Sequence, residues 1–247
     1  MTHFDALAPD YDRLRPAGEG WQEVAGRALE ALAGATRLLD VGCGTGRFAV
    51  LAAEHLGARV WGVDASAEML REARALPAAA GVGWRQADAT RLPFKDGWFD
   101  AVHTHLVLHL VGDVPAALAE MARVLRPGGR IAIGTFAPEH FREFFLNPYF
   151  PSIPGIDLAR FPAPDALCGL LTSAGFTDAA VERFDQPVTA AAADVLERAR
   201  GRYISTLRLL DESEYTSGLA QLEADVAAGR DAFSYTLRWA LVSARRG

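Results

Sequence analysis

Cysteine is scarce in this chain of 247 residues, which contains only Cys43 and Cys168. The two cysteines show no metal-ligand spacing, so we expect no metal site. Cys43 lies among closely spaced glycines, where it serves as a small residue. We expect both thiols to remain reduced, in a cytoplasmic protein.

Long apolar runs and basic clusters are also missing. No uninterrupted apolar stretch is long enough to cross a membrane, and the N-terminal residues do not resemble a signal peptide. The formal net charge is -6 and the isoelectric point is near 5.5. We therefore expect neither a membrane nor a nucleic acid as partner. Half of the residues are hydrophobic, which is enough for the core of one α/β domain.

The most informative stretch is Leu38–Phe48, LLDVGCGTGRF. Its apolar start predicts a buried strand, which leads into Gly42, Gly44 and Gly46 and then into a helix over 47–56. Closely spaced glycines let a ligand approach main-chain N–H groups without interference from a Cβ atom. The start of the helix adds unpaired N–H donors and a partial positive charge. This turn is therefore predicted to bind a ligand.

Two kinds of nucleotide ligand compete for such a turn. The dinucleotide motif G-x-G-x-x-G would place its third glycine at position 47, which is Arg47 here. The observed pattern is D-x-G-x-G-x-G, with Asp40 just before the turn. A carboxylate at this place is unfavourable for pyrophosphate, and it suits a ligand with a cationic amine or sulfonium.

A second carboxylate, Asp64, ends the next predicted strand, over 59–63. It follows the glycines by about 20 residues, the position from which such folds bind the two ribose hydroxyls. Asp64 could also be the N-cap of the following helix. We favour the ribose role, with which a capping role is compatible.

Strand and helix alternate from residue 38 to residue 136, which predicts a parallel, doubly wound sheet. Further strands are predicted at 84–87, 99–105 and 131–136, and a helix at 114–125. In such sheets the ligand lies beyond the carboxyl ends of the strands. These ends carry Asp40, Asp64, Asp88 and His105.

The flanking regions are less regular. Residues 3–16 predict a short amphipathic helix, in which Tyr11 and Arg15 lie one turn apart, and 21–33 predicts a full helix. Residues 137–164 are rich in Phe and Pro and predict a packed loop or a lid. We predict helices at 164–174 and at 190–228, the latter interrupted near Gly201, Ser213 and Gly218. Strands are predicted at 176–184 and 234–244.

Four segments resemble successive motifs of the class I S-adenosylmethionine-dependent methyltransferases: LLDVGCGTGRF, VWGVDASAEML, QADATRLPFKDGWFDAV and LRPGGRIAIGTF. The chain is most similar to small-molecule enzymes of the type 11 group, such as those acting on quinone precursors and malonyl-carrier protein. The resemblance implies a Rossmann-like α/β fold with a doubly wound, seven-stranded sheet whose last strand is antiparallel. It also implies one domain over 1–247, with an N-terminal helical cap (1–34), a cofactor-binding core (35–136) and substrate-side helical insertions (137–165 and 187–232).

The resemblance implies contacts with S-adenosylmethionine. Asp40 and the turn Gly42–Gly46 would hold the methionine part, and Asp64 would bind the ribose hydroxyls. His105 would offer its carbonyl to the methionine ammonium group, and Tyr11 would close over the cofactor.

The resemblance further implies contacts with the adenine ring. Ala65 and Met69 would lie beside the ring. Asp88 would accept a hydrogen bond from the adenine amino group, and the Ala89 N–H would meet a ring nitrogen.

The implied reaction is methyl transfer to a small-molecule acceptor by in-line displacement, which requires placement of the nucleophile and exclusion of water. A general base is needed only when the nucleophile starts protonated. His109 is the best candidate base, and a packing role is an equal alternative. His103 and His140 are weaker candidates.

The acceptor pocket is expected among the aromatic residues and late helices, which favours an aromatic or acyl acceptor. Candidate pocket residues are Arg142, Tyr149, Arg202 and Tyr203. The oligomeric state stays open between monomer and homodimer. Two other functions remain: a protein that binds S-adenosylmethionine without methyl transfer, and, less favoured because of Asp40 and Arg47, a dinucleotide-dependent oxidoreductase.

Overall fold

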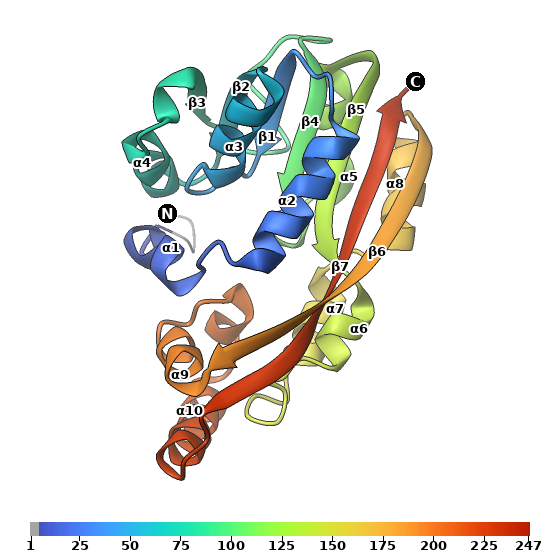
Figure 1. Cartoon of the computed structure of the whole chain (residues 1–247). Helices are drawn as coiled ribbons and strands as arrows, with labels where there is room; N and C mark the ends of the chain where they lie inside the picture. The colour runs from blue at the N-terminus through green and yellow to red at the C-terminus, as the bar shows by residue number, and fades with distance from the viewer. Residues whose placement is uncertain (1–4) are drawn as a thin grey trace.

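The computed structural model describes residues 5–247, apart from the side chain of Glu19, and forms a seven-stranded sheet with the order β3-β2-β1-β4-β5-β7-β6 (Figure 1). The strands are β1 Arg37–Val41, β2 Arg59–Asp64, β3 Val82–Gln86, β4 Phe99–His105, β5 Leu125–Phe136, β6 Phe176–Ala191 and β7 Ala232–Arg246. The first five pair in parallel, and β7 runs antiparallel to both β5 and β6. The predicted doubly wound sheet with an antiparallel last strand is confirmed.

Helices cover both faces of the sheet because consecutive strand residues point to opposite faces. Leu38 packs in one core with residues of α2 (Glu19–Ala31) and α3 (Arg47–Leu56). Leu39 packs in another core with residues of α5 (Val114–Val124) and α8 (Pro164–Ser173). Burial on both faces explains why the strands read as continuous apolar runs.

The helix after β2 is α4, Ala67–Ala75. Its N-cap is Ser66, whose hydroxyl accepts a hydrogen bond from the Met69 N–H at 3.1 Å. The alternative that Asp64 caps this helix is therefore wrong, because Asp64 lies two residues too early. Its carboxylate instead accepts hydrogen bonds from two backbone N–H groups, those of Gly44 and Ser66, as described below.

Strands β6 and β7 continue far beyond the sheet as a two-stranded hairpin that carries α9 (Ala192–Arg200) and α10 (Glu212–Ala227) (Figure 1). Both strands are longer than predicted. A third hydrophobic core joins these helices to the 146–153 segment, through residues such as Phe150, Leu196 and Leu222. This part of the chain thus has apolar packing of its own.

The predicted break near Gly201 is confirmed, because α9 ends at Arg200. The predicted break near Ser213 is also confirmed, because no α-helix lies between Arg200 and Glu212, where α10 begins. The predicted break near Gly218 is wrong, since this residue lies within α10. A Cβ atom on Gly218 would lie 2.1 Å from the Tyr149 carbonyl oxygen. Gly218 therefore allows close packing of the helix and does not end it.

The remaining elements are short. They are the helices α1 Tyr11–Leu14, α6 Pro138–Arg142 and α7 Ile153–Arg160, and the 3-10 turns η1 Ala8–Asp10, η2 Ala79–Gly81, η3 Leu108–Leu110 and η4 Ser205–Arg208. The predicted N-terminal helix over 3–16 is thus reduced to η1 and α1, and its first two residues lie outside the described part. Across residues 5–247, none of the helices has the length and apolar character needed to cross a bilayer.

Candidate functional site

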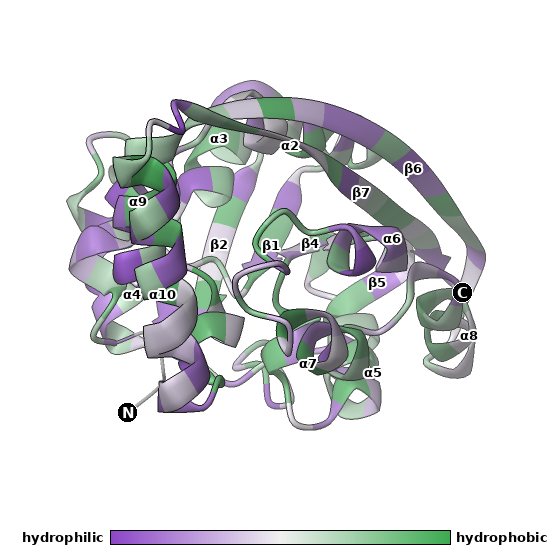
Figure 2. Cartoon of the chain, turned by 90° about the horizontal axis from the view of Figure 1, so that it is seen from below, coloured by the Kyte–Doolittle hydropathy of each residue, from purple (hydrophilic) through white to green (hydrophobic). Residues whose placement is uncertain are grey.

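A cavity of about 1280 Å³ lies at the carboxyl ends of β1, β2 and β4. Figure 2 views the molecule from this end, with α9 and α10 on one side, α6 and α7 on the other, and β1 and β4 between them. The predicted site residues that line the cavity are Tyr11, Asp40, Gly42, Gly44, Asp64, Ala65, Met69, Asp88, Ala89, His105 and His109. Gly46 is not among the lining residues. Tertiary structure thus brings eleven of the twelve predicted residues to one cavity.

The three glycines of the turn serve different purposes, although all have positive φ angles, of 71°, 53° and 84°. A Cβ atom on Gly42 would lie 2.3 Å from Val107, and one on Gly46 would lie 2.6 Å from Trp84. At Gly44 no described atom lies within 4 Å of the Cβ position. Gly44 therefore offers open backbone to the cavity, whereas Gly42 and Gly46 permit close packing.

Asp64 ties this turn to the start of α4. Its Oδ2 accepts a hydrogen bond from the Gly44 N–H, and its Oδ1 accepts one from the Ser66 N–H, both at 2.8 Å. Burial raises the pKa of Asp64 above the usual value of a carboxyl group. Each oxygen keeps a further lone pair, so the carboxylate can still accept hydrogen bonds from a ligand.

Asp40 and His103 are register partners on β1 and β4. The His103 Nδ1 lies 2.8 Å from Asp40 Oδ1, and both residues are only 2% exposed. Phe48 stacks on the His103 ring with a centroid distance of 3.4 Å. Within residues 5–247, Asp40 Oδ2 is buried without a hydrogen-bond partner. A buried carboxylate needs a hydrogen-bond partner. The position of His103 directly opposite Asp40 on the neighbouring strand is therefore the signal that could have identified His103 as this partner.

Four of the described histidines line the cavity, and a lowered pKa keeps three of them as neutral imidazoles. Burial, as the main cause, lowers the pKa of His105, His109 and His140 to about 3 each. The His109 ring stacks on Phe161 at 3.8 Å, and the His140 ring stacks on Phe136 at 3.9 Å. At neutral pH these rings therefore contribute hydrogen-bonding groups and flat surfaces without a positive charge.

Asp88 is exposed at the edge of the cavity. Its Oδ1 accepts hydrogen bonds from the N–H and the hydroxyl of Thr90, at 2.8 and 2.7 Å, and these bonds lower the Asp88 pKa. The carboxylate is therefore charged at neutral pH and held in one orientation.

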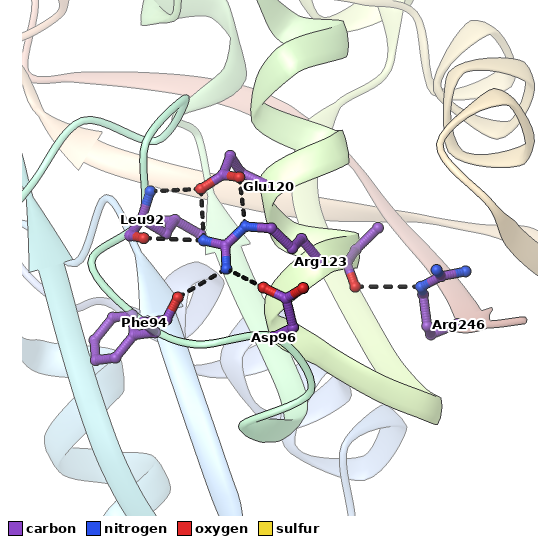
Figure 3. A network of polar contacts seen from close by, with 7 residues as sticks. Leu92, Phe94, Asp96, Glu120, Arg123 and Arg246 are labelled. Carbon is purple, nitrogen blue, oxygen red and sulfur yellow. Dashed lines mark hydrogen bonds and ion pairs between the residues drawn. The ribbon is translucent and has the colours of Figure 1, made fainter.

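The segment after Asp88 and Ala89 is held by Arg123 of α5 (Figure 3). The Arg123 guanidinium donates to the Leu92 carbonyl at 3.0 Å and to the Phe94 carbonyl at 2.8 Å. It also binds the Glu120 and Asp96 carboxylates, and Glu120 accepts the Leu92 N–H at 2.8 Å. This network fixes the loop that bounds one side of the cavity.

The N-terminal segment closes over the glycine turn. Asp12 accepts a hydrogen bond from the Thr45 hydroxyl at 2.7 Å and pairs with Arg47 at 3.0 Å. Arg47 also donates to the Arg15 carbonyl at 2.6 Å, and the Arg15 guanidinium donates to the Tyr11 hydroxyl at 3.0 Å. Arg47, which breaks the dinucleotide motif, thus holds this segment in place, a role that sequence reasoning missed.

Aromatic residues line the other half of the cavity: Phe136, Phe141, Phe144, Phe145, Phe161, Tyr203, Tyr235 and Trp239. Of the candidate pocket residues, only Tyr203 lines the cavity. The other three are directed elsewhere by ionic or hydrogen-bonded partners: Arg142 by Glu139, Tyr149 by Asp225 and Arg202 by Glu212. In residues 5–247, no group of three or more His, Cys, Asp or Glu residues is arranged to hold a metal ion.

The family model described as a methyltransferase domain matches residues 39–133. The 2-phytyl-1,4-naphtoquinone methyltransferase of Thermosynechococcus vestitus is 36% identical over 199 residues, covering 70% of this chain and 88% of that protein. The demethylmenaquinone methyltransferase of Thermus thermophilus is 36% identical over 202 residues, covering 70% of this chain and 91% of that protein.

The fold has matches among solved structures. A protein from an antibiotic biosynthesis pathway of Anabaena variabilis, provisionally assigned as a methyltransferase, aligns with a TM-score of 0.70 at 25% identity, over 89% of this chain and 96% of that one. Sequence relatives, strand order and the matched domain all agree with the four motif segments. The chain therefore belongs to the class I S-adenosylmethionine-dependent methyltransferases and transfers methyl groups to small molecules.

Proposed function

We propose that this methyltransferase acts on a planar aromatic or conjugated acceptor. The observation that carries the proposal is the division of one cavity into two halves, one with the carboxylates of Asp40, Asp64 and Asp88 and one with aromatic rings. Aromatic side chains stack on planar ligands and exclude water from them. Two relatives are named for naphthoquinone and demethylmenaquinone substrates, which belong to this class of acceptor.

We assign the cofactor to the carboxylate half. The residues fit S-adenosylmethionine in two respects: the buried Asp40 Oδ2 has no partner in the described structure, and the Gly44 backbone is open to the cavity. Asp40 complements the positive charge of the methionine part, with Gly42, Gly44 and the His105 carbonyl nearby. Gly46 contributes by letting the turn pack against Trp84.

The nucleoside belongs to the residues that follow β2 and β3. Asp64 binds the ribose hydroxyls, because the Gly44 and Ser66 N–H groups hold its carboxylate at the carboxyl end of β2. Ala65 and Met69 lie beside the adenine. Asp88 accepts a hydrogen bond from the adenine amino group, and the Ala89 N–H donates one to a ring nitrogen. Tyr11 covers the cofactor from the N-terminal segment.

When bound, the cofactor would supply the methyl group of its sulfonium; the acceptor would gain this methyl group as its bond to sulfur breaks, and S-adenosylhomocysteine would be the leaving group. The protein aligns the acceptor and excludes water, since the Asp12–Arg47 pair closes the N-terminal segment over the turn. We assign His109 as the group that accepts the nucleophile's proton. With a pKa of about 3 it is a weak base, so it suits an acidic enol or phenol and not an alcohol.

The test is calorimetric titration with S-adenosylmethionine, S-adenosylhomocysteine and NAD. We expect both adenosyl ligands to bind and NAD not to bind. Asp64→Ala should weaken binding by more than about tenfold, or roughly 1.4 kcal/mol. Asp165→Ala is the matched control, because Asp165 is exposed, pairs with Arg183 and lies outside the cavity. Unchanged binding in Asp64→Ala would contradict the assignment.

A second assay separates an enzyme from a protein that only binds the cofactor. Planar phenols, enols and quinols are incubated with S-adenosylmethionine labelled in the methyl group. Labelled product establishes the acceptor class, and its loss in His109→Phe, which preserves the flat ring against Phe161, tests the proton-accepting role.

A further inference from the structure

Two arginines that line the cavity have no carboxylate partner in the part of the chain that the structure describes: Arg15 and Arg198. Arg15 donates instead to the Tyr203 carbonyl at 2.8 Å and to the Tyr11 hydroxyl. The Arg198 guanidinium has no hydrogen-bond or ion-pair partner among residues 5–247. By contrast, Arg47 is paired with Asp12 at 3.0 Å. A half-buried cation without a partner is costly, so its position on a cavity wall indicates an anionic ligand.

Two tyrosine hydroxyls lie near these arginines. Tyr203 and Tyr235 both line the cavity, and the charge of Arg198 acts on both hydroxyls, while Arg15 also acts on Tyr203. Burial raises the pKa of both phenols, so that each keeps its O–H donor. Tyr235 is held by stacking on Phe145 at 4.1 Å with an interplanar angle of 13°. These four side chains therefore offer several hydrogen-bond donors and no negative charge.

Two carboxylates in the same half limit how much negative charge a ligand can bring. Asp157 is buried, accepts a hydrogen bond from the Thr206 hydroxyl at 2.5 Å and lies 3.5 Å from Arg160. Asp194 precedes Arg198 by one turn of α9 and lines the cavity, but no ion pair joins the two in the described structure. A ligand with a single negative charge meets less repulsion here than a dianion does.

We propose that the acceptor carries a carboxylate, which binds to Arg198 and Arg15 with the hydroxyls of Tyr203 and Tyr235, while its planar body lies among the aromatic rings. A guanidinium group matches a carboxylate with two parallel hydrogen bonds. Charge then helps to separate the two substrates, since the acceptor half, unlike the cofactor half, contains two arginines that have no carboxylate partner within the described residues. This inference rests on the proposed function, because it requires an aromatic acceptor in this half of the cavity.

The test uses 2-naphthoate and its neutral analogue 2-naphthamide, titrated into the full chain saturated with S-adenosylhomocysteine. We expect naphthoate to bind at least about tenfold more tightly than the amide. Arg198→Met should remove this difference and leave amide binding unchanged. Arg200→Met is the matched control, because Arg200 lies on the same helix, pairs with Glu223 at 2.7 Å and does not line the cavity.

Three outcomes overturn the inference: equal binding of acid and amide, a preference for the acid that survives in Arg198→Met, or tighter binding of 2-naphthyl phosphate than of naphthoate. Titration of S-adenosylhomocysteine on the same preparations separates the two proposals. Failure to bind it counts against the proposed function, whereas normal binding without a preference for the acid counts against the carboxylate alone. If Arg198→Met does not fold, the same comparison of acid and amide is made with Arg198→Lys. The salt dependence of binding to the wild type is then also measured, since the inference requires salt to weaken the binding of the acid and not that of the amide.

Discussion

His103 and Asp40 face one another across β4 and β1, with Nδ1 and Oδ1 2.8 Å apart and both side chains hidden from water. This pair lines the carboxylate half of the cavity, and one carboxylate oxygen has no further partner within residues 5–247. The carboxylate half of the cavity thus contains a buried carboxylate whose hydrogen-bond partner in the described structure is an imidazole.

Replacing His103 alone should destabilise the protein strongly. His103→Phe keeps a ring against Phe48 but leaves the Asp40 carboxylate unpaired, which costs roughly 3 to 5 kcal/mol. Adding Asp40→Leu should recover part of this loss, because the buried charge is then removed. Urea unfolding measures both. Asp165→Ala, which breaks the exposed pair with Arg183, is the control and should cost less than about 1 kcal/mol. A loss in His103→Phe no greater than in this control would contradict the role of the pair.

A comparison of substitutions at Gly42 and Gly57 distinguishes the cost of a steric clash from the cost of backbone strain. Both have positive φ, but a Cβ atom meets Val107 at 2.3 Å in Gly42, whereas no described atom lies within 4 Å in Gly57. Gly57→Ala should lower the free energy of unfolding by about 1 kcal/mol. Gly42→Ala should cost about 1 to 3 kcal/mol more. Combining Gly42→Ala with Val107→Ala should return the loss to that of Gly57→Ala. Equal losses in the two single variants would disprove the contact.

The protein should lose stability in mild acid. His105, His109 and His140 have folded-state pKa values of about 3, below the unfolded value of about 6.5. The unfolded chain therefore binds more protons in this window, so stability is complete above about pH 6.5 and falls as the pH drops toward 3. Each imidazole contributes a slope of up to about 1.4 kcal/mol per pH unit.

His140→Phe removes one of these groups and should make the pH dependence of urea unfolding shallower. Val195→Ala, which removes buried atoms of the third core without a titrating group, serves as the control for general destabilisation. The same slope in His140→Phe and in the wild type would show that burial does not suppress protonation of this ring.

The network around Arg123 should not tolerate lysine. Arg123→Lys loses the fork that joins the Leu92 and Phe94 carbonyls to Glu120, so the free energy of unfolding should fall by about 1 to 3 kcal/mol. Binding of S-adenosylhomocysteine should weaken as well, because the loop follows Asp88 and Ala89. Arg126→Met is the control, since the Arg126 guanidinium donates a hydrogen bond to the Pro127 carbonyl at 3.4 Å and interacts with the charge of Asp100, but takes no part in the Arg123 network. A similar effect in both variants would contradict this account.

Local sequence was sufficient for the elements that surround the carboxylate half of the cavity. The predicted bounds of the helix Arg47–Leu56 and the strand Phe99–His105 match the structure residue for residue. Side-chain periodicity and the φ angles that glycine permits act over a few neighbouring residues, so they can be predicted without the fold. The polar groups at the strand ends follow from the same pattern, because parallel strands end at one edge of a sheet.

Tertiary structure alone decided the rest. Asp40 and His103 lie 63 residues apart, and Arg15 and Tyr203 lie 188 residues apart. Gly218 continues a helix because the Tyr149 carbonyl lies against it, and Tyr203 reaches the cavity whereas Tyr149 does not. The outcomes at Gly218 and Tyr203 depend on how helices pack on the β6–β7 hairpin, and the Asp40–His103 pair depends on the pairing of β1 with β4. Packing between distant segments is governed by the shape and burial of the whole fold, which local propensity does not contain.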